Sequence, residues 1–142
     1  MPSAASSAQR EAKRLASLTF FLDHQIGRYV VANALRGTGA QVEVHLDHFP
    51  ADEPDTEWIH EIGKRGWVLI TKDQKIRRNP LERAAYEVAK LRGFIVTGKD
   101  MSGKDLSDLL VRCLPGMVRR TAGRSGPLLF TISRGGVFTK LI

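Results

Sequence analysis

The sequence predicts an α/β protein, a three-layer sandwich in which helices cover both faces of a central, mostly parallel sheet. Short apolar segments alternate with amphipathic helical segments almost without exception along the chain. The apolar segments are also continuous rather than alternating, as expected for strands of a parallel sheet that is buried on both faces. With 142 residues, the chain is long enough for one domain with its own hydrophobic core.

Each expected element has a local signal. Strands are expected where apolar and aromatic residues run together, and helices where apolar residues recur at helical spacing between glycines and prolines. The expected strands are 18–22, 41–46, 67–71, 94–97 and 128–132, followed by an extended segment at 136–141. The expected helices are 26–36, 55 to about 63–66, 80–92 with Gly93 as its end, and 104–118 with a break or bend near Pro115.

The amino-terminal residues 1–17 are interpreted as a flexible basic tail, and residues 18–142 as the folded domain. Residues 1–9 are small and polar and have no apolar core, so they do not resemble a secretory signal and are expected to be disordered. The basic residues of 10–17 suit a frayed helix or an arm. No apolar run approaches the roughly 18 to 20 residues that span a bilayer, so no membrane partner is expected.

The single cysteine and the charge distribution give the first indications of environment and partner. Cys113 lies in an apolar segment, excludes an internal disulfide and fits a reducing cytoplasm, where a buried hydrophobic role is expected. The formal net charge is +7, yet residues 43–61 contain seven acids and no Lys or Arg. A basic protein with one concentrated acidic region suits a polyanionic substrate bound beside a metal ion. Basic surfaces are also common without such a role, so charge alone favours nucleic acid only modestly.

Several acids follow the predicted strands at the edge where parallel sheets carry their active sites. Asp23 and Asp73 each occupy the first or second position after a strand, and Asp100 follows the fourth strand. Asp55 and Glu57 open the helix that leads from the second strand to the third. Because the carboxyl ends of parallel strands share one edge, these acids are expected to converge there and to require a cation. Oxygen ligands select Mg²⁺ or Mn²⁺, and the matching chemistry is phosphodiester hydrolysis.

Each acid also has a structural interpretation that remains open at this point. Asp23 can cap the following helix, and Asp73 can cap the turn that it begins. Asp55 is a good N-cap residue, and the same carboxylate can cap a helix and bind a metal. Glu57 and Asp100, taken singly, are expected more often as solvated surface acids than as ligands.

Four basic residues crowd the segment after Asp73, on the same predicted edge: Lys72, Lys75, Arg77 and Arg78. They are candidates for binding the phosphates of a nucleic acid, in which case each contact makes the affinity more sensitive to salt. Solvated surface positions are the equally open alternative.

The histidines do not predict a zinc site. His45 and His48 run off the end of a strand and have no cysteine partner. His24, beside Asp23, can tune a metal site or contact substrate, but a surface or capping role is expected. The glycines near Thr38 and Lys99 lack the spacing of a phosphate-binding loop, which argues against nucleoside triphosphate hydrolysis.

Three segments resemble the motifs of PIN-like domains: Phe21-Leu22-Asp23, Asp55-Thr56-Glu57-Trp58-Ile59 and Val68-Leu69-Ile70-Thr71-Lys72-Asp73. The resemblance extends over essentially the whole chain from Leu18, and it is strongest to VapC-type toxins. It implies that Asp23, Asp55 and Asp73 bind Mg²⁺ or Mn²⁺ and act catalytically, with Glu57 as the fallback. Lys75 stands where related branches carry a second aspartate, so the fourth acid is open and Asp100 is its candidate.

The resemblance implies a metal-dependent endoribonuclease that hydrolyses RNA phosphodiester bonds as the cytoplasmic toxin of a type II toxin–antitoxin pair. A cognate antitoxin protein and a homodimer are the further partners that the family implies. Two other classes remain open: a catalytically silent PIN-like interaction domain and a receiver-like phosphoacceptor domain. The receiver class is disfavoured because it requires adjacent acids after the first strand, whereas the chain has Asp23-His24 there.

Overall fold

The computed structural model describes residues 4–26 and 29–142 and contains one six-stranded sheet. Its strand order is β2-β1-β3-β4-β5-β6, and every neighbouring pair is parallel except β5 with β6. The strands are β1 (Thr19–Leu22), β2 (Gln41–Val44), β3 (Val68–Thr71), β4 (Arg92–Val96), β5 (Leu128–Ile132) and β6 (Phe138–Lys140). The predicted α/β sandwich with a mostly parallel sheet is confirmed.

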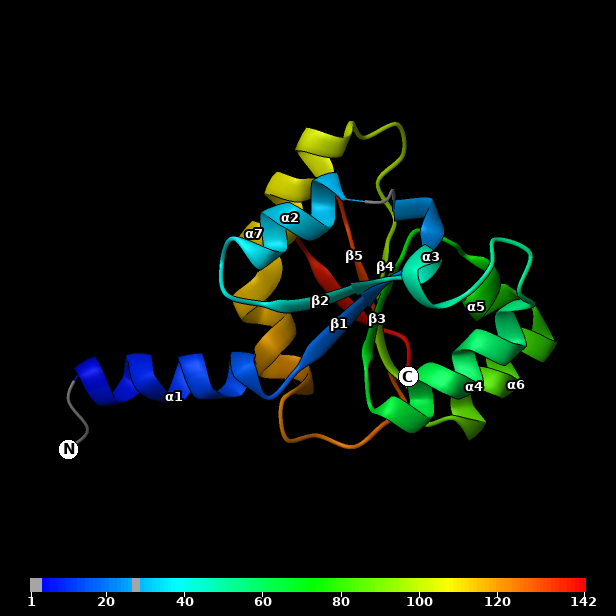
Figure 1. Cartoon of the computed structure of the whole chain (residues 1–142), viewed down its shortest axis with the longest axis horizontal. Helices are drawn as coiled ribbons and strands as arrows, with labels where there is room; N and C mark the ends of the chain where they lie inside the picture. Colours follow the sequence, from blue (N-terminus) through cyan, green and yellow to red (C-terminus); the bar gives the residue numbers. More distant parts are fainter. Residues whose placement is uncertain (1–3, 27–28) are drawn as a thin grey trace.

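Helices cover both faces of this sheet (Figure 1). One face is covered by α2 (Val30–Arg36) and α7 (Gly103–Thr121), which pack against each other. The other face is covered by α4 (Asp55–Arg65), α5 (Lys75–Arg78) and α6 (Pro80–Val88). Two short turns complete this set: the 3-10 helix η1 (His24–Ile26) follows β1, and α3 (His45–His48) follows β2.

Strand residues alternate between two separate cores, because successive side chains of a strand point to opposite faces. In β1, Phe20 and Leu22 join the core beneath α2 and α7, whereas Phe21 joins the core beneath α4 and α6. The same alternation holds in β3, where Leu69 lies in the core beneath α4 and α6 and Ile70 in the opposite one. This parity determines on which side of the sheet the residues that follow each strand emerge.

The connection pattern puts a topological switch point between β1 and β3. From β1 the chain crosses to β2 on one side, and it then returns to add β3 on the other side of β1. In open α/β sheets, ligands bind in the crevice beyond the carboxyl ends of the strands at such a point. Asp23 and Asp73 follow the two strands that flank it.

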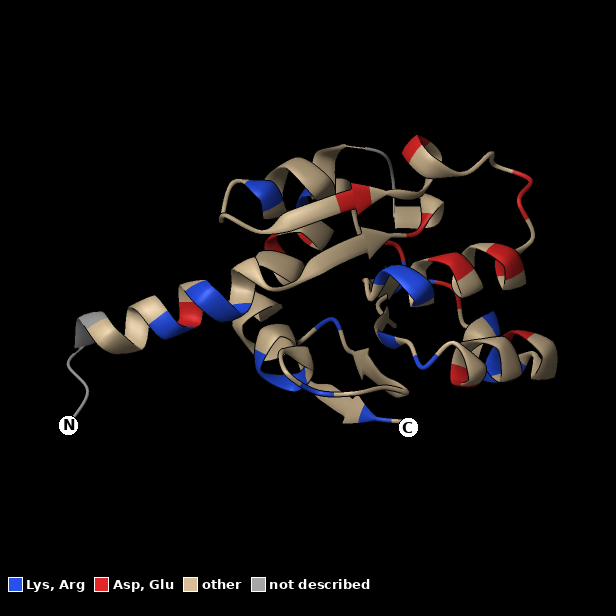
Figure 2. Cartoon of the chain, turned by 60° about the horizontal axis from the view of Figure 1, so that its bottom comes forward, with Lys and Arg blue, Asp and Glu red and all other residues tan. Residues whose placement is uncertain are grey.

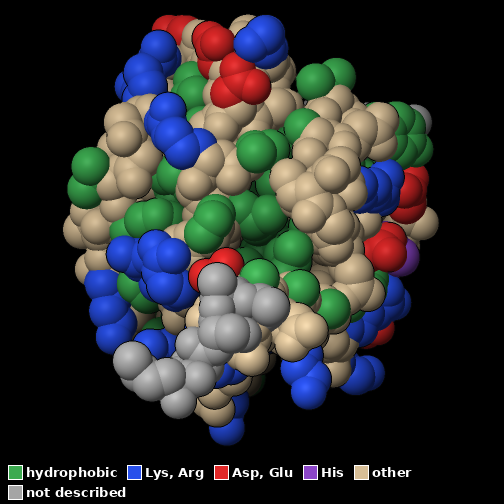
Figure 3. All heavy atoms as spheres, turned by 90° about the vertical axis from the view of Figure 1, so that its left-hand side faces the viewer, with side chains coloured by type: hydrophobic (Ala, Val, Ile, Leu, Met, Phe, Trp, Pro, Cys, Tyr) green, Lys and Arg blue, Asp and Glu red, His purple; other side chains and the backbone are tan. Residues whose placement is uncertain are grey.

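The amino-terminal segment is helical at 10–16, where a frayed helix or an arm was expected, and also at 4–9, where disorder was expected. Residues from Ala4 form a helix, α1 (Ala4–Ala16), that projects from the body of the molecule (Figure 1). Between α1 and the carboxyl-terminal half of α7 lies a groove of about 330 Å³, lined mainly by Leu15, Leu114, Pro115 and Val118. Figure 3 shows the face from which α1 projects, with hydrophobic side chains gathered near its centre. The division into a flexible tail at 1–17 and a domain at 18–142 remains a prediction.

Three other boundaries differ from those expected. The second strand ends at Val44 because the chain turns into α3 at His45, and the segment after Asp73, expected as a loop, contains α5. Helix α6 ends at Val88, so Gly93 lies inside β4 instead of ending a helix. A Cβ atom on Gly93 would lie 2.8 Å from the Tyr86 hydroxyl, so close packing of α6 on the sheet requires glycine there.

Helix α7 continues through Pro115 to Thr121 without the expected break. Leu114 and Met117, on either side of the proline, are both buried against the sheet and hold the helix in place. None of the described helices combines the length and the apolar composition needed to cross a bilayer.

Candidate metal centre

Three neighbouring strands present a row of polar residues at the carboxyl edge of the sheet. Leu22 is in register with Val44 on one side and with Ile70 on the other. The next residues along the three strands are therefore His45, Asp23 and Thr71, which continue the row. By strand parity, all three emerge on the face covered by α4 and α6. Each of them is at most 2% exposed.

Helices α4 and α6 bring further acids to this edge. Asp55 precedes Ile59 and Ile62 by four and seven residues, so it lies on the stripe of α4 that packs against the sheet. Glu82 precedes the buried Tyr86 by four residues on α6 and is itself 7% exposed. Asp55, Asp73 and Glu82 each offer a carboxylate oxygen, and these oxygens lie within 4.8 Å of one another. We call these three residues the acidic cluster. Asp55 and Asp73 are two of the three principal predicted ligands, whereas Glu82 was not predicted.

Glu82 was missed because its position in the sequence resembles an ordinary helix start. It follows Pro80 in the first turn of α6, where an acid is favoured by the helix dipole alone. A signal was nevertheless present, because Glu82 and Tyr86 share one helix face and an acid on an apolar face requires a partner. Lys75 stands where related branches carry a second aspartate, and the third carboxylate of this group comes instead from Glu82 on the next helix.

Thr71 connects Asp23 to the acidic cluster. Its hydroxyl donates a hydrogen bond of 2.8 Å to Asp23 Oδ2 and accepts one of 2.9 Å from the backbone N–H of Asp73. One buried hydroxyl oxygen makes both hydrogen bonds. It therefore fixes the position of Asp23 relative to Asp73. The Asp23 side chain therefore borders the acidic cluster, and the charge of Asp55 acts on it.

The electrostatics of these acids are those expected of a cation site. Burial raises the pKa of Glu82 to about 7, helped by a side-chain hydrogen bond with Asp55 and by the charges of Asp55 and Asp73. Burial also raises the pKa of Asp23, against the opposing effects of the Thr71 hydrogen bond and the His24 ring. Oε1 of Glu82 and Oδ1 of Asp23 are buried without a hydrogen-bond partner. A divalent cation would offset this repulsion and satisfy these oxygens, so the residues fit a metal ion.

Asp55 and Asp73, two of the three principal predicted ligands, also make local contacts. Asp55 is the first residue of α4, not its cap, which is Pro54. Its Oδ1 accepts a hydrogen bond of 2.9 Å from the indole of Trp58, which orients the carboxylate. Asp73 Oδ1 accepts one of 2.9 Å from the backbone N–H of Lys75. Since both carboxylate oxygens carry lone pairs, neither bond prevents metal binding.

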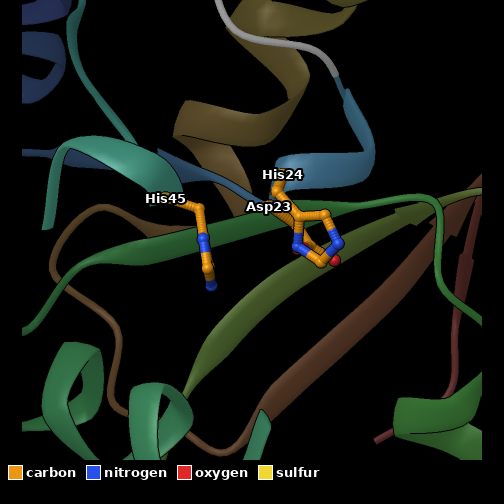
Figure 4. Close-up of side chains that lie close together, drawn as sticks. All are labelled: Asp23, His24 and His45. Atoms are coloured by element: carbon orange, nitrogen blue, oxygen red, sulfur yellow. The ribbon is translucent and has the colours of Figure 1, made fainter. Parts of the chain in front are cut away.

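A second group of ligand atoms adjoins the first. Asp23, His24 and His45 each offer one ligand atom, and these atoms also lie within 4.8 Å of one another. Figure 4 shows the two imidazole rings side by side, with the Asp23 carboxylate next to His24. The ring centroids of His24 and His45 are 5.0 Å apart. Burial lowers the pKa of His45, although the charge of Asp23 acts in the opposite direction. The lowered pKa favours the neutral imidazole.

The two remaining acid candidates lie outside both groups. Glu57 is exposed on α4, because it is displaced by two residues from Asp55 and so lies off the buried stripe. Asp100 is exposed in the loop after β4, with a positive φ of 56°. Among the described residues, neither belongs to a cluster of potential ligands. Their roles as ligands remain predictions without geometric support.

The basic candidates border the acidic cluster. Lys75, Arg77 and Arg78 lie in α5, immediately after Asp73, and Lys72 precedes it. In the part of the chain that the structure describes, none of the four forms an ion pair with an acid. Figure 2 shows acids concentrated on α4 and the loop before it, whereas the charged residues of α1 are mainly basic. Their role in phosphate binding remains a prediction.

The fold and this edge of the sheet define a class of protein. Residues 18–98, more than half of the chain, match the family described as "PIN like domain". This match includes every member of both ligand clusters. The chain belongs to the PIN-like domain family.

One curated relative is similar over most of its length. The Mycobacterium tuberculosis protein named "Putative ribonuclease VapC45" is 27% identical over 116 residues, which cover 79% of this chain and 83% of the relative. No solved structure matches the chain significantly.

Proposed function

We propose that this protein is a metal-dependent endoribonuclease that hydrolyses RNA phosphodiester bonds. The observation that supports this most is the acidic cluster of Asp55, Asp73 and Glu82, next to Asp23, at the switch point of a PIN-like sheet. The similarity to a protein that is named as a ribonuclease of the VapC type points to the same activity.

In this proposal, Asp55, Asp73 and Glu82 hold a Mg²⁺ or Mn²⁺ ion, with Asp23 bordering it. A bound ion would lower the pKa of the attacking water and would offset the charge that develops on the phosphate. Trp58 and the backbone of Lys75 orient two of the ligand carboxylates, and Thr71 fixes the third aspartate. Glu82 would release its proton on binding of the ion, because burial and the neighbouring Asp55 and Asp73 raise its pKa, whereas a cation would favour its charged form.

RNA is the proposed substrate, and four side chains are proposed to hold its phosphates: Lys72, Lys75, Arg77 and Arg78. They flank Asp73 on the open edge of the sheet, and none of them forms an ion pair with an acid among the described residues, although the charge of Lys75 acts on Glu82. The acidic cluster alone would repel RNA, so adjacent cations and a bound metal are both required for substrate to approach.

The VapC-type relative further supports the role of the toxin in a type II toxin–antitoxin pair, with a cognate antitoxin protein as partner. A homodimer and a cytoplasmic location follow from the same family likeness. The direct test is the arrangement of genes beside this one together with the growth of cells that express the protein with and without its neighbour.

RNA cleavage by the purified protein tests the nuclease proposal. Cleavage is expected in Mg²⁺ or Mn²⁺ and should stop with EDTA. Asp73→Asn should lower the rate at least about a hundredfold, since a metal contributes several kcal/mol and each 1.4 kcal/mol is worth a factor of ten. Glu57→Gln, which alters an exposed acid on the same helix as Asp55, is the matched control and should leave the rate unchanged.

A different result would identify the alternative function. If the wild-type protein binds no Mn²⁺ and cleaves no RNA, the protein is a catalytically silent PIN-like interaction domain. If Asp73→Asn cleaves RNA as fast as the wild type, the proposed metal centre is wrong, although a nuclease remains.

A further inference from the structure

We propose that Asp23, His24 and His45 form a second metal site, for a transition-metal ion of the Zn²⁺ or Co²⁺ class. Their ligand atoms lie within 4.8 Å of one another, and this group is distinct from the acidic cluster that the proposed nuclease centre uses. The proposal does not depend on nuclease activity.

The principal observation is the state of the His45 side chain. It is fully buried, and both ring nitrogens lack a hydrogen-bond partner. A buried imidazole is normally paired through at least one nitrogen, since an orphaned polar group destabilises the fold. Oδ1 of Asp23, in the same group, is also buried and without a hydrogen-bond partner. The two ring nitrogens of His45 therefore lie without partners in the same group as a carboxylate oxygen that contacts only the His24 ring among the described ion pairs.

His24 supplies the third ligand. Its Nδ1 is 3.0 Å from Asp23 Oδ1, although the two atoms are not aligned for a hydrogen bond. The His24 side chain is 38% exposed, so its ring has room to turn. An ion about 2.0–2.2 Å from each ligand can join atoms up to about 4.4 Å apart, so a small rotation of this ring is sufficient to complete the site.

The chemistry of the ligands selects the ion. Two imidazoles and one carboxylate suit Zn²⁺, Co²⁺ and similar ions, whereas Mg²⁺ prefers oxygen alone. Three protein ligands also leave a coordination position open to solvent. The acidic cluster, which offers only carboxylates, has the opposite preference. Two adjacent sites of different selectivity would therefore lie on either side of the Asp23–Thr71 hydrogen bond.

Sequence spacing alone points to the wrong histidine partner. His48 follows His45 by three residues, but its ring contacts Glu43, with 2.8 Å between Nε2 and Oε2. The partner of His45 is instead His24, which is 21 residues away in the chain and begins η1, just after the neighbouring strand β1. This explains why the two histidines did not form a recognisable pattern in the sequence.

Titration of the full-length protein with Co²⁺ tests the proposal, with calorimetry for affinity and proton NMR for the histidine ring signals, which bound Co²⁺ shifts strongly. We expect two shifted histidine rings in the wild type, displacement by Zn²⁺ and no displacement by excess Mg²⁺. His45→Phe keeps an aromatic ring against Phe21 and Trp58 and should remove the shifted signals, with at least a tenfold loss of affinity at this site. His24→Ala should do the same at an exposed position, even if His45→Phe fails to fold.

Two control variants separate this proposal from the nuclease. Asp73→Asn should keep the shifted histidine signals, because it alters only the acidic cluster, and exposed His60→Ala should behave as the wild type. The proposal is overturned if the wild type shows no shifted histidine signals, or if His24→Ala retains them. A protein that shows these signals but cleaves no RNA would support the second site while contradicting the proposed function.

Discussion

The two faces of the sheet use the same strands for different purposes. On the face covered by α2 and α7, strand residues such as Leu22 and Ile70 belong to an apolar core that extends to the carboxyl edge of the sheet. On the face covered by α4 and α6, the core of Phe21 and Leu69 gives way at that edge to Asp23 and Thr71. Adjacent residues of one strand thus serve stability on one face and candidate chemistry on the other.

This difference follows from the alternation of side chains along each strand and from the residues that each helix pair places against the sheet. Helices α4 and α6 each place an acid, Asp55 and Glu82, on the same stripe as their buried apolar residues. Helix α7 instead places Leu106, Leu109 and Leu110 at the corresponding end of its face. In the proposed function, a cation would therefore stabilise this polar edge of Asp23, Asp55, Asp73 and Glu82, whereas the apolar face has no such need. The predictions below separate these two roles.

The largest effect is expected from a cavity in the apolar face. Leu22→Ala removes a fully buried side chain one residue before Asp23 and should lower the free energy of unfolding by about 2–5 kcal/mol. Chemical denaturation measures this loss. Mn²⁺ affinity of the folded protein should stay within about twofold of the wild type, and a large loss of affinity would show that the two faces are not separable.

The next effect concerns Thr71, a positioning residue of the polar edge. Thr71→Val keeps the shape of the side chain but removes the hydroxyl that joins Asp23 to Asp73, so Mn²⁺ affinity should fall about 10–100-fold. Thr71→Ser retains the hydroxyl and should restore most of this affinity. Equal affinities for the valine and serine variants would mean that the hydroxyl does not position the ligands.

The pH dependence of stability distinguishes Glu82 from the surface acids. Its folded-state pKa of about 7 exceeds its ordinary value of 4.5, so its contribution to stability is complete below pH 4.5 and is lost as the pH rises through 7. In EDTA, the Tm difference between wild type and Glu82→Gln should therefore shift in favour of the variant between pH 5 and pH 8. Saturating Mn²⁺ should reverse that shift. Glu57→Gln serves as the control and should show no such dependence.

The smallest effect is expected from the basic residues beside the site. Each phosphate contact to single-stranded RNA contributes about 0.7 to the slope of log affinity against log salt concentration. Arg78→Ala should lower the slope by about that amount in RNA binding measured with the Asp73→Asn protein. Lys13→Ala, on the projecting helix α1, is the matched control and should leave the slope unchanged. Equal slopes for Arg78→Ala and the parent protein would show that Arg78 does not contact an RNA phosphate.

Much of this architecture follows from short-range patterns in the sequence. The continuous apolar strands, the acids that follow them and the acid that opens α4 predicted the sheet, its carboxyl edge and the positions of Asp23, Asp55 and Asp73. The other residues of the two ligand groups could not be recognised, because they lie far apart in the sequence. Glu82 and His45 resemble a helix-start acid and a strand-end histidine until the register of β1 with β2 and the packing of α6 bring them to the same edge. Glu57 was a plausible ligand by spacing, but the helical turn carries it to solvent.

The central claim is that the carboxylates of the polar edge form a metal centre, and calorimetric titration with Mn²⁺ tests it most directly. The wild type should bind Mn²⁺ with release of protons near pH 7, and Asp55→Asn, Asp73→Asn and Glu82→Gln should each weaken binding at least about tenfold, while Glu57→Gln should not. Wild-type binding that survives unchanged in Asp55→Asn and Asp73→Asn, or no binding at all, would contradict the account.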